Sequence, residues 1–193
     1  KVDLGQPVAT ATAEPTVEKG TTSMRKQYDS PPAMTIDPTK SYTATIEMEK
    51  GGEVVIELLV SEAPQTVNNF VFLARDGYYD GVTFHRVLAD FMAQSGDPTG
   101  LGTGGPGYTI PDEFHKKLKF DRAGRLGMAN SGPNTGGSQF FLTTVPTPWL
   151  DGNHAVFGEV IEGMENVYRI ENCDLKPGDR PYDPQQIVSV ERI

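Results

Sequence analysis

Hydrophobic and polar residues alternate along most of residues 42–60. The apolar members of this alternation are Tyr42, Ala44, Ile46, Met48, Val54, Ile56, Leu58 and Val60. A Lys-Gly-Gly-Glu sequence interrupts it after Glu49 and supplies residues that suit a turn. Because successive side chains of a β-strand point to opposite faces, the pattern predicts a β-hairpin with one buried face.

Two other segments place their apolar residues at helical spacing. The first begins at Pro64, which is compatible with a first helical turn, and ends at Gly77, which is typical of a helix stop. The second is expected over residues 164–171. Further short strands, separated by Gly and Pro, are expected at residues 82–87, 91–94, 125–129, 139–144, 155–160 and 187–193. Many short strands with two distant helices predict a closed or nearly closed sheet rather than alternating βαβ units.

The charge of the chain excludes some classes of function. The formal net charge is −9 and the pI is about 4.8. Nucleic-acid binding needs clustered Lys and Arg, so no nucleic-acid partner is expected. No run of about 18 apolar residues occurs, so no transmembrane segment is expected. Five acidic and five basic residues cancel within residues 1–40, so the whole negative charge belongs to residues 41–193.

The first forty residues differ in composition from the rest. They contain seven Thr, five Pro and four Ala residues but one aromatic residue, Tyr28. Such a composition buries too little apolar surface to offset the entropy lost on ordering. Residues 1–40 are therefore predicted to be a flexible N-terminal extension or linker, and residues 41–193 the folded domain.

The sequence starts at Lys1 without an initiator Met, which suggests that an upstream signal or anchor segment has been removed. We therefore expect an extracytoplasmic location, periplasmic or tethered to a surface, with the cytoplasm as the alternative. A second role for the extension is also open. Its Ser-Pro-Pro-Ala sequence at residues 30–33 contains X-Pro bonds that the groove of a neighbouring molecule could bind.

The residues that often bind metals do not form a ligand pattern. Cys173 is the one cysteine, and His85, His115 and His154 are 30 and 39 residues apart. These separations match no common ligand spacing, so neither a metal site nor a cofactor is expected. Ser138, in Gly136-Gly137-Ser138-Gln139, lacks the second glycine of the Gly-x-Ser-x-Gly nucleophile elbow. The glycine-rich residues 100–107 lack the Lys-Ser/Thr that follows a phosphate-binding loop.

Four separated motifs combine one permanent cation with amides and large apolar side chains. They are Phe84-His85-Arg86 with Phe91-Met92-Ala93-Gln94, then Met128-Ala129-Asn130, then Ser138-Gln139-Phe140-Phe141, and finally Trp149-Leu150-Asp151-Gly152-Asn153-His154. In order and spacing they resemble the cyclophilin family of peptidyl-prolyl cis-trans isomerases, and the resemblance covers residues 41–193. It implies a mainly β fold, an eight-stranded antiparallel β-barrel capped by two α-helices. It also implies that the glycine-rich loop borders the active groove.

The resemblance assigns catalytic roles to Arg86, Gln94, Asn130 and Gln139. Arg86 would donate hydrogen bonds to the twisting X-Pro bond, since a guanidinium stays protonated and presents a fixed fork of N–H groups. Gln94 and the backbone of Asn130 would hold the flanking peptide, and Gln139 would help to orient Arg86.

The resemblance also implies a pocket for the proline ring. Its substrate-binding residues would be Phe91, Met92, Ala129, Ser131, Phe141, Trp149, Leu150 and His154. Taken singly, the apolar ones are more often barrel core. Ser131 stands where alanine is common, which adds a hydroxyl beside the groove. A tryptophan at position 149 favours cyclosporin binding in this family, so cyclosporin is an expected ligand.

The predicted function is therefore prolyl isomerisation that assists protein folding. The expected partners are proline-containing peptides and unfolded proteins, and a monomer is expected. The alternative is a proline-peptide-binding chaperone or scaffold module with little turnover. The presence of Arg86 favours the enzyme, because capture alone needs no cation at the isomerising bond.

Overall fold

The computed structural model describes residues 26–192, and residues 1–25 and 193 lie outside the described part. The strands are β1 (Tyr42–Met48), β2 (Glu53–Leu58), β3 (Arg86–Leu88), β4 (Met92–Ser95), β5 (Arg125–Met128), β6 (Phe140–Thr143), β7 (Val156–Glu162), β8 (Leu175–Lys176), β9 (Arg180–Pro181) and β10 (Ile187–Arg192). The helices are α1 (Pro64–Arg75), α2 (Met164–Glu171) and the short 3-10 turn η1 (Pro148–Leu150).

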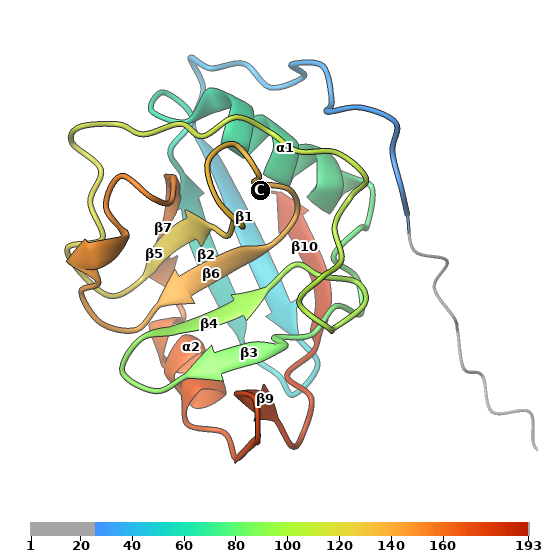
Figure 1. The fold of residues 1–193 in the computed structure, drawn as a ribbon, viewed down its shortest axis with the longest axis vertical. Helices are drawn as coiled ribbons and strands as arrows, with labels where there is room; N and C mark the ends of the chain where they lie inside the picture. The colour runs from blue at the N-terminus through green and yellow to red at the C-terminus, as the bar shows by residue number, and fades with distance from the viewer. Residues whose placement is uncertain (1–25, 193) are drawn as a thin grey trace, which may run out of the picture.

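Eight strands form one curled antiparallel sheet in the order β10-β1-β2-β7-β5-β6-β4-β3, with α1 and α2 at opposite ends (Figure 1). The residues that precede β3 join the two edges. Phe84 N–H donates to the Gln185 carbonyl over 2.9 Å, and Ile187 N–H donates to the Val82 carbonyl over 2.8 Å. The mainly β fold, the eight antiparallel strands and the two capping helices are thus confirmed. A curled sheet of this kind presents one face to a common interior and the other to the surface.

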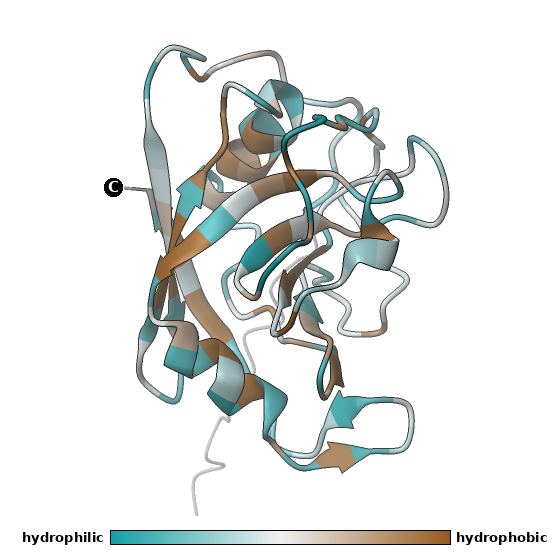
Figure 2. Cartoon of the chain, turned by 90° about the vertical axis from the view of Figure 1, so that its left-hand side faces the viewer, coloured by the Kyte–Doolittle hydropathy of each residue, from teal (hydrophilic) through white to brown (hydrophobic). Residues whose placement is uncertain are grey.

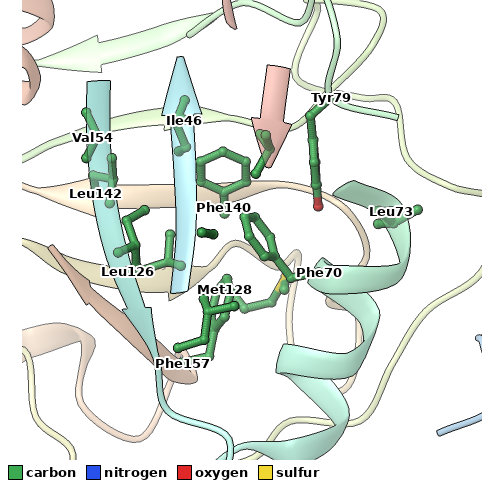
Figure 3. Close-up of a cluster of buried hydrophobic side chains, with 14 of the residues drawn as sticks. Ile46, Val54, Phe70, Leu73, Tyr79, Leu126, Met128, Phe140, Leu142 and Phe157 are labelled. Carbon is green, nitrogen blue, oxygen red and sulfur yellow. The ribbon is translucent and has the colours of Figure 1, made fainter. Parts of the chain in front are cut away.

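The interior is filled by rings and aliphatic side chains from the sheet and α1. Phe140 lies at its centre, with ring centroids 5.5 Å from both Phe70 and Tyr79 (Figure 3). Phe70 also packs 5.5 Å from Phe157. Edge-to-face aromatic pairs of this kind add to the stabilisation that apolar burial gives. Hydrophobic residues accordingly concentrate in the central strands and along α1, whereas the loops are mostly polar or neutral (Figure 2).

Two local predictions differ from the structure. The strand expected over residues 82–87 is shorter, because Thr83 makes only an isolated bridge to Gln186 and the regular ladder begins at Arg86. The small hairpin of β8 and β9 was not predicted. Its strands have two residues each, too few to show alternation, and its turn contains Asp179 at a φ of 61°.

The N-terminal strap, defined here as residues 26–40, crosses over α1 and leads into β1 (Figure 1). Ile36 is only 5% exposed and belongs to the main hydrophobic core. Asn68 of α1 accepts hydrogen bonds from the backbone N–H groups of Thr35 and Ile36 and donates to the Ala33 carbonyl. The strap therefore packs against the domain, where part of a flexible linker was expected, and residues 1–25 of that predicted linker lie outside the described part. The strap packs because Asn68 of α1 forms hydrogen bonds with its backbone and because Ile36 enters the core.

Candidate functional site

A cavity of about 270 Å³ opens on the outer face of the sheet beside β3 and β4. We call it the first cavity. Its lining residues are Arg86, Phe91, Met92, Gln94, Ala129, Asn130, Phe141, Leu150 and His154. All nine were predicted as site residues from the sequence, so the fold brings these distant positions together.

The apolar floor of the first cavity is separate from the main core. Met92 and Phe141 are 2% and 4% exposed and form a second cluster with Phe120 and Val156. The alternative interpretation, that these side chains fill the barrel interior, is therefore wrong for Met92 and Phe141. Strand side chains that point away from the interior can line a pocket on a rigid scaffold.

A glycine creates the space for Phe141. Gly127 of β5 lies opposite Phe141 of β6 in the sheet register. A Cβ atom on Gly127 would lie 2.3 Å from Cζ of Phe141 and 2.9 Å from Cε1 of Phe120. The two rings stack with centroids 5.5 Å apart and an interplanar angle of 24°. The cavity floor therefore requires a glycine at position 127, which was not predicted from the sequence. A glycine inside a strand indicates that another group packs closely against it, but not which group.

Arg86 lies at the exposed edge of the first cavity and is held by a row of amide groups. Its Nη1 donates to Oε1 of Gln94 over 3.4 Å, and Gln94 Nε2 donates to Oε1 of Gln139 over 2.9 Å. Gln139 Nε2 in turn donates to the backbone carbonyls of Gly102 and Gly104. Gln139 therefore reaches Arg86 only through Gln94. Among residues 26–192 the Arg86 guanidinium makes no ion pair, so its charge remains available to a ligand.

His154 and Asn130 also line the first cavity. The His154 ring meets Phe141 edge to face at 5.4 Å, and its Nδ1 lies 2.9 Å from the Met128 carbonyl. Because a carbonyl only accepts, Nδ1 carries the proton in this contact. Asn130 donates from Nδ2 to the Asn153 carbonyl over 2.8 Å. Its side chain is thereby engaged within the protein, which fits the predicted use of the Asn130 backbone rather than its amide.

A second cavity of about 470 Å³ adjoins the first and shares Gln94, Ala129 and Asn130 with it. The predicted residues Ser131 and Gln139 line this second cavity. The glycine-rich loop, residues 102–106, also lines it, as the resemblance implied, whereas Tyr108, Thr109, Thr135, Gly137 and Ser138 were not predicted as site residues. The run of glycines was the available signal, but it does not specify which side chains stand opposite the loop.

Asp97 organises the glycine-rich loop. Its fully buried carboxylate accepts hydrogen bonds from the backbone N–H groups of Thr99, Gly102 and Gly104 and from the Thr99 hydroxyl. Burial opposes ionisation of Asp97, but these donors outweigh it and hold its pKa below the usual range. A buried carboxylate with several donors fixes a loop whose glycines would otherwise be free to adopt many conformations.

Trp149 lies outside the lining of both cavities. It is 60% exposed on η1, and its ring packs against Phe91 with centroids 5.8 Å apart. It therefore borders the first cavity only through Phe91, and its predicted contact with ligands stays a prediction.

The described part of the chain offers little for metal or membrane chemistry. Within residues 26–192 no group of three His, Cys, Asp or Glu side chains could hold a metal ion. No helix in the same range is long and apolar enough to cross a bilayer. The site consists of one arginine, amides and apolar rings.

Comparison with known sequences gives consistent matches. The family model of the cyclophilin type peptidyl-prolyl cis-trans isomerase matches residues 43–192. The peptidyl-prolyl cis-trans isomerase ppi1 of Schizosaccharomyces pombe is 48% identical over 149 residues, which are 75% of this chain and 96% of that protein. The mouse peptidylprolyl isomerase domain and WD repeat-containing protein 1 is 52% identical over 143 residues, or 72% of this chain, but the chain spans only 22% of that protein's length.

Solved structures give the same result. A cyclophilin type peptidyl-prolyl cis-trans isomerase from Cryptosporidium parvum superposes with a TM-score of 0.75 at 38% identity, covering 78% of this chain and 96% of that one. A second structure of that protein, in the presence of the dipeptide Ala-Pro, gives a TM-score of 0.74 at 38% identity and covers 77% and 96% of the two chains. By sequence, fold and site, the chain belongs to the cyclophilin-type peptidyl-prolyl cis-trans isomerase family.

Proposed function

We propose that this chain catalyses cis-trans isomerisation of X-Pro bonds in peptides and unfolded proteins and thereby assists folding. The observation that carries the proposal is an arginine that makes no ion pair within residues 26–192 and that Gln94 orients beside a cavity of about 270 Å³ with an apolar floor. An apolar pocket with one oriented cation suits a substrate that is itself apolar and carries a single reacting carbonyl and nitrogen.

The chemistry requires no proton transfer. Amide resonance opposes rotation with a barrier of about 18–20 kcal/mol. As the bond twists, the proline nitrogen becomes pyramidal and more basic, so a donor near it binds the twisted state more strongly than either planar isomer. The guanidinium of Arg86 supplies such a donor.

The cation alone is insufficient for a large acceleration. A hydrogen bond to a charged group contributes roughly 1.5–3 kcal/mol, whereas an acceleration of about 10⁵-fold needs about 7 kcal/mol. Anchoring of the proline ring on Met92 and Phe141 contributes the rest, because rotation then occurs against a fixed frame. The flanking peptide is held by Gln94 and the Asn130 backbone.

The decisive experiment is a protease-coupled isomerisation assay on an Ala-Pro-Phe peptide with wild type, Arg86→Ala and Arg86→Lys. We expect the alanine variant to lose about 100-fold in kcat/KM, equivalent to the loss of one strong charge-assisted bond. The lysine variant should recover only part of this, since it keeps the charge but not the fork. Arg75→Ala, on an exposed arginine at the end of α1, is the matched control and should behave as wild type.

The same variants separate the enzyme from a binding module. Proline-peptide affinity, measured by isothermal titration calorimetry, should fall far less than turnover in Arg86→Ala. Equal losses in affinity and turnover would favour the binding module, and full turnover without Arg86 would overturn the mechanism.

We propose that the chain also binds cyclosporin and works as a monomer. Trp149 offers an exposed ring next to Phe91 at the border of the first cavity, and a single chain supplies the lining of both cavities. Trp149→Ala should weaken cyclosporin binding at least about tenfold, since aromatic residues dominate such contacts. The stability of Trp149→Ala should hardly change, because the ring is exposed. Unchanged affinity for cyclosporin would refute the role assigned to Trp149.

Light scattering of the wild type tests the monomer, and the mass of a dimer would reject it.

We propose an extracytoplasmic location on composition alone, since the sequence before the strap is rich in Thr, Ala and Pro. Immunoblots of fractionated source cells test it. Recovery of the protein with cytoplasmic markers would reject the proposal.

A further inference from the structure

We propose that the N-terminal strap is a positioning element for the second cavity, with Tyr28 as its principal positioning residue. It would thereby set how strongly the protein selects the peptide residues that flank the X-Pro bond. This inference rests on the proposed function and extends it to a segment outside the family match, which begins at residue 43.

The strap holds the glycine-rich loop from behind. The backbone N–H of Tyr28 donates to the Pro106 carbonyl over 2.8 Å, and Gln27 Nε2 donates to the Gly105 carbonyl over 2.7 Å. Both Gly105 and Pro106 line the second cavity. The two chains approach so closely that a Cβ on Gly107, whose φ is +97°, would lie 2.7 Å from the Tyr28 carbonyl oxygen. Gln27 and Tyr28 bond to residues of the cavity wall but do not themselves line the second cavity.

Tyr28 anchors this contact to the body of the domain. Its ring meets Phe72 of α1 edge to face at 5.1 Å and lies 6.2 Å from the ring of Tyr108, another residue of the second cavity. Its hydroxyl donates to Asp76 over 2.7 Å, and Lys26 forms an ion pair with the same carboxylate at 3.1 Å. The strap thus connects the end of α1 with the loop, and Tyr28 makes contacts to both.

The contact extends to the facing wall of the cavity through Tyr108. The Tyr108 hydroxyl donates to Oδ1 of Asn69 over 2.6 Å, and Asn69 Nδ2 donates to the Gly137 carbonyl over 2.7 Å. Pro106 also packs close to Gly137, whose Cβ position would be 3.1 Å from the proline Cδ. The strap, the loop and residue 137 therefore form one connected set of contacts around the second cavity.

A fixed wall changes peptide binding in a specific way. Glycines lose more conformational freedom than other residues when they become ordered. A ligand that had to order the loop itself would bind more weakly, and a loop already held by the strap removes that cost. The benefit goes only to peptides long enough to reach the second cavity. The bond rotation beside Arg86 should be unaffected.

The test compares peptides that differ in reach, using full-length wild type, Tyr28→Ala, Tyr28→Phe and Gln27→Ala. One peptide is a blocked Ala-Pro dipeptide, and the others extend Ala-Pro on either side with a bulky or a small residue. For extensions that reach the second cavity, Tyr28→Ala should raise KM and Kd roughly fivefold, because it removes the ring contacts to Phe72 and Tyr108 that anchor the strap. Its kcat and its values for the dipeptide should stay at the wild-type level.

The milder variants keep the test valid if Tyr28→Ala folds poorly. Gln27 is exposed, and Gln27→Ala removes the Gly105 bond without touching the core. Its selectivity should shift in the same direction but less. Tyr28→Phe keeps the ring contacts and the backbone bond to Pro106, so it should restore most of the wild-type selectivity.

Ile36→Ala is the matched control within the strap. It removes most of a side chain that is only 5% exposed. The backbone of Ile36 is hydrogen-bonded to Asn68 rather than to the loop. It should lower the unfolding midpoint yet leave the ratio of long-peptide to dipeptide affinity unchanged. The proposal fails if Tyr28→Ala and Gln27→Ala change the affinity for the dipeptide and for the longer peptides equally. It also fails if their ratio of long-peptide to dipeptide affinity matches that of Ile36→Ala, because the strap would then be merely structural.

The failure of the proposed function can be recognised separately. A wild type that accelerates neither peptide would reject isomerisation, whereas direct Kd measurements on the same peptides would still decide whether Tyr28 controls selectivity.

Discussion

The two adjoining cavities are built in different ways. The first has a floor of strand side chains, with Met92 and Phe141 almost fully buried on a ladder of hydrogen bonds. The second has a wall of glycine-rich backbone that Asp97 and Gln139 hold from within and Tyr28 holds from behind. Rigid strands suit the step that every substrate shares, the rotation of one bond. A loop fixed by a few bonds suits the part of the site where substrates differ.

The largest effect is expected from filling the space under the first cavity. In Gly127→Ala the new Cβ would lie 2.3 Å from the Phe141 ring within a paired strand, so the ring has to move. Overpacking of this kind costs about 1–3 kcal/mol, and a displaced Phe141 should lower kcat/KM at least about tenfold for every peptide, whatever its length.

Chemical denaturation and the isomerisation assay measure the two effects. Gly105→Ala, assayed on the dipeptide that does not reach the second cavity, is a suitable control, since nothing lies within 4 Å of its Cβ position. Undiminished activity of Gly127→Ala would show that the floor of the first cavity is not rigid and would weaken the comparison.

A smaller and more selective loss is expected for Asp97→Asn. The substitution keeps the size of the side chain but removes the charge that three backbone N–H groups and the Thr99 hydroxyl share. Weakening charge-assisted bonds should cost about 1–3 kcal/mol. Long peptides should lose affinity, whereas turnover of a dipeptide should persist. Loop amide exchange, followed by NMR, measures the loosening directly, and protection equal to wild type would contradict the role of Asp97.

The smallest effect is a pH dependence of stability that arises beneath the loop. His85 is 6% exposed, and its ring lies 3.5 Å from the Cβ position of Gly102. Burial lowers the pKa of His85, with Arg180 and Arg86 acting in the same direction and Asp97 opposing them. The unfolded chain therefore binds a proton that the folded chain excludes. The free energy of unfolding should fall as the pH drops through the unfolded pKa of about 6.5.

Urea unfolding should give a lower free energy of unfolding at pH 5.5 than at pH 7.5. One proton can contribute at most about 1.4 kcal/mol over the one pH unit below the unfolded pKa. In His85→Gln this part of the loss should disappear. An identical loss in the variant would assign the effect to other groups.

The strands and helices were predictable because their signals are local. Alternation from Tyr42 to Val60 and helical spacing after Pro64 gave β1, β2 and α1 almost to the residue. The hairpin of β8 and β9 was missed because two-residue strands show no period. The strap was expected to be a linker because composition averages over forty residues, whereas its packing depends on a few, chiefly Tyr28 and Ile36.

The sequence by itself determined the chemistry of the first cavity: one arginine, amides and large apolar side chains in an order that resembles a known family. Nine predicted residues line that cavity. Only the tertiary structure decided that Gln139 acts through Gln94, that Ser131 belongs to the second cavity, that Gly127 makes room for Phe141 and that Tyr28 supports the loop. Residue types follow from local sequence, but these contacts join positions that are distant in the chain and become adjacent only when the sheet closes.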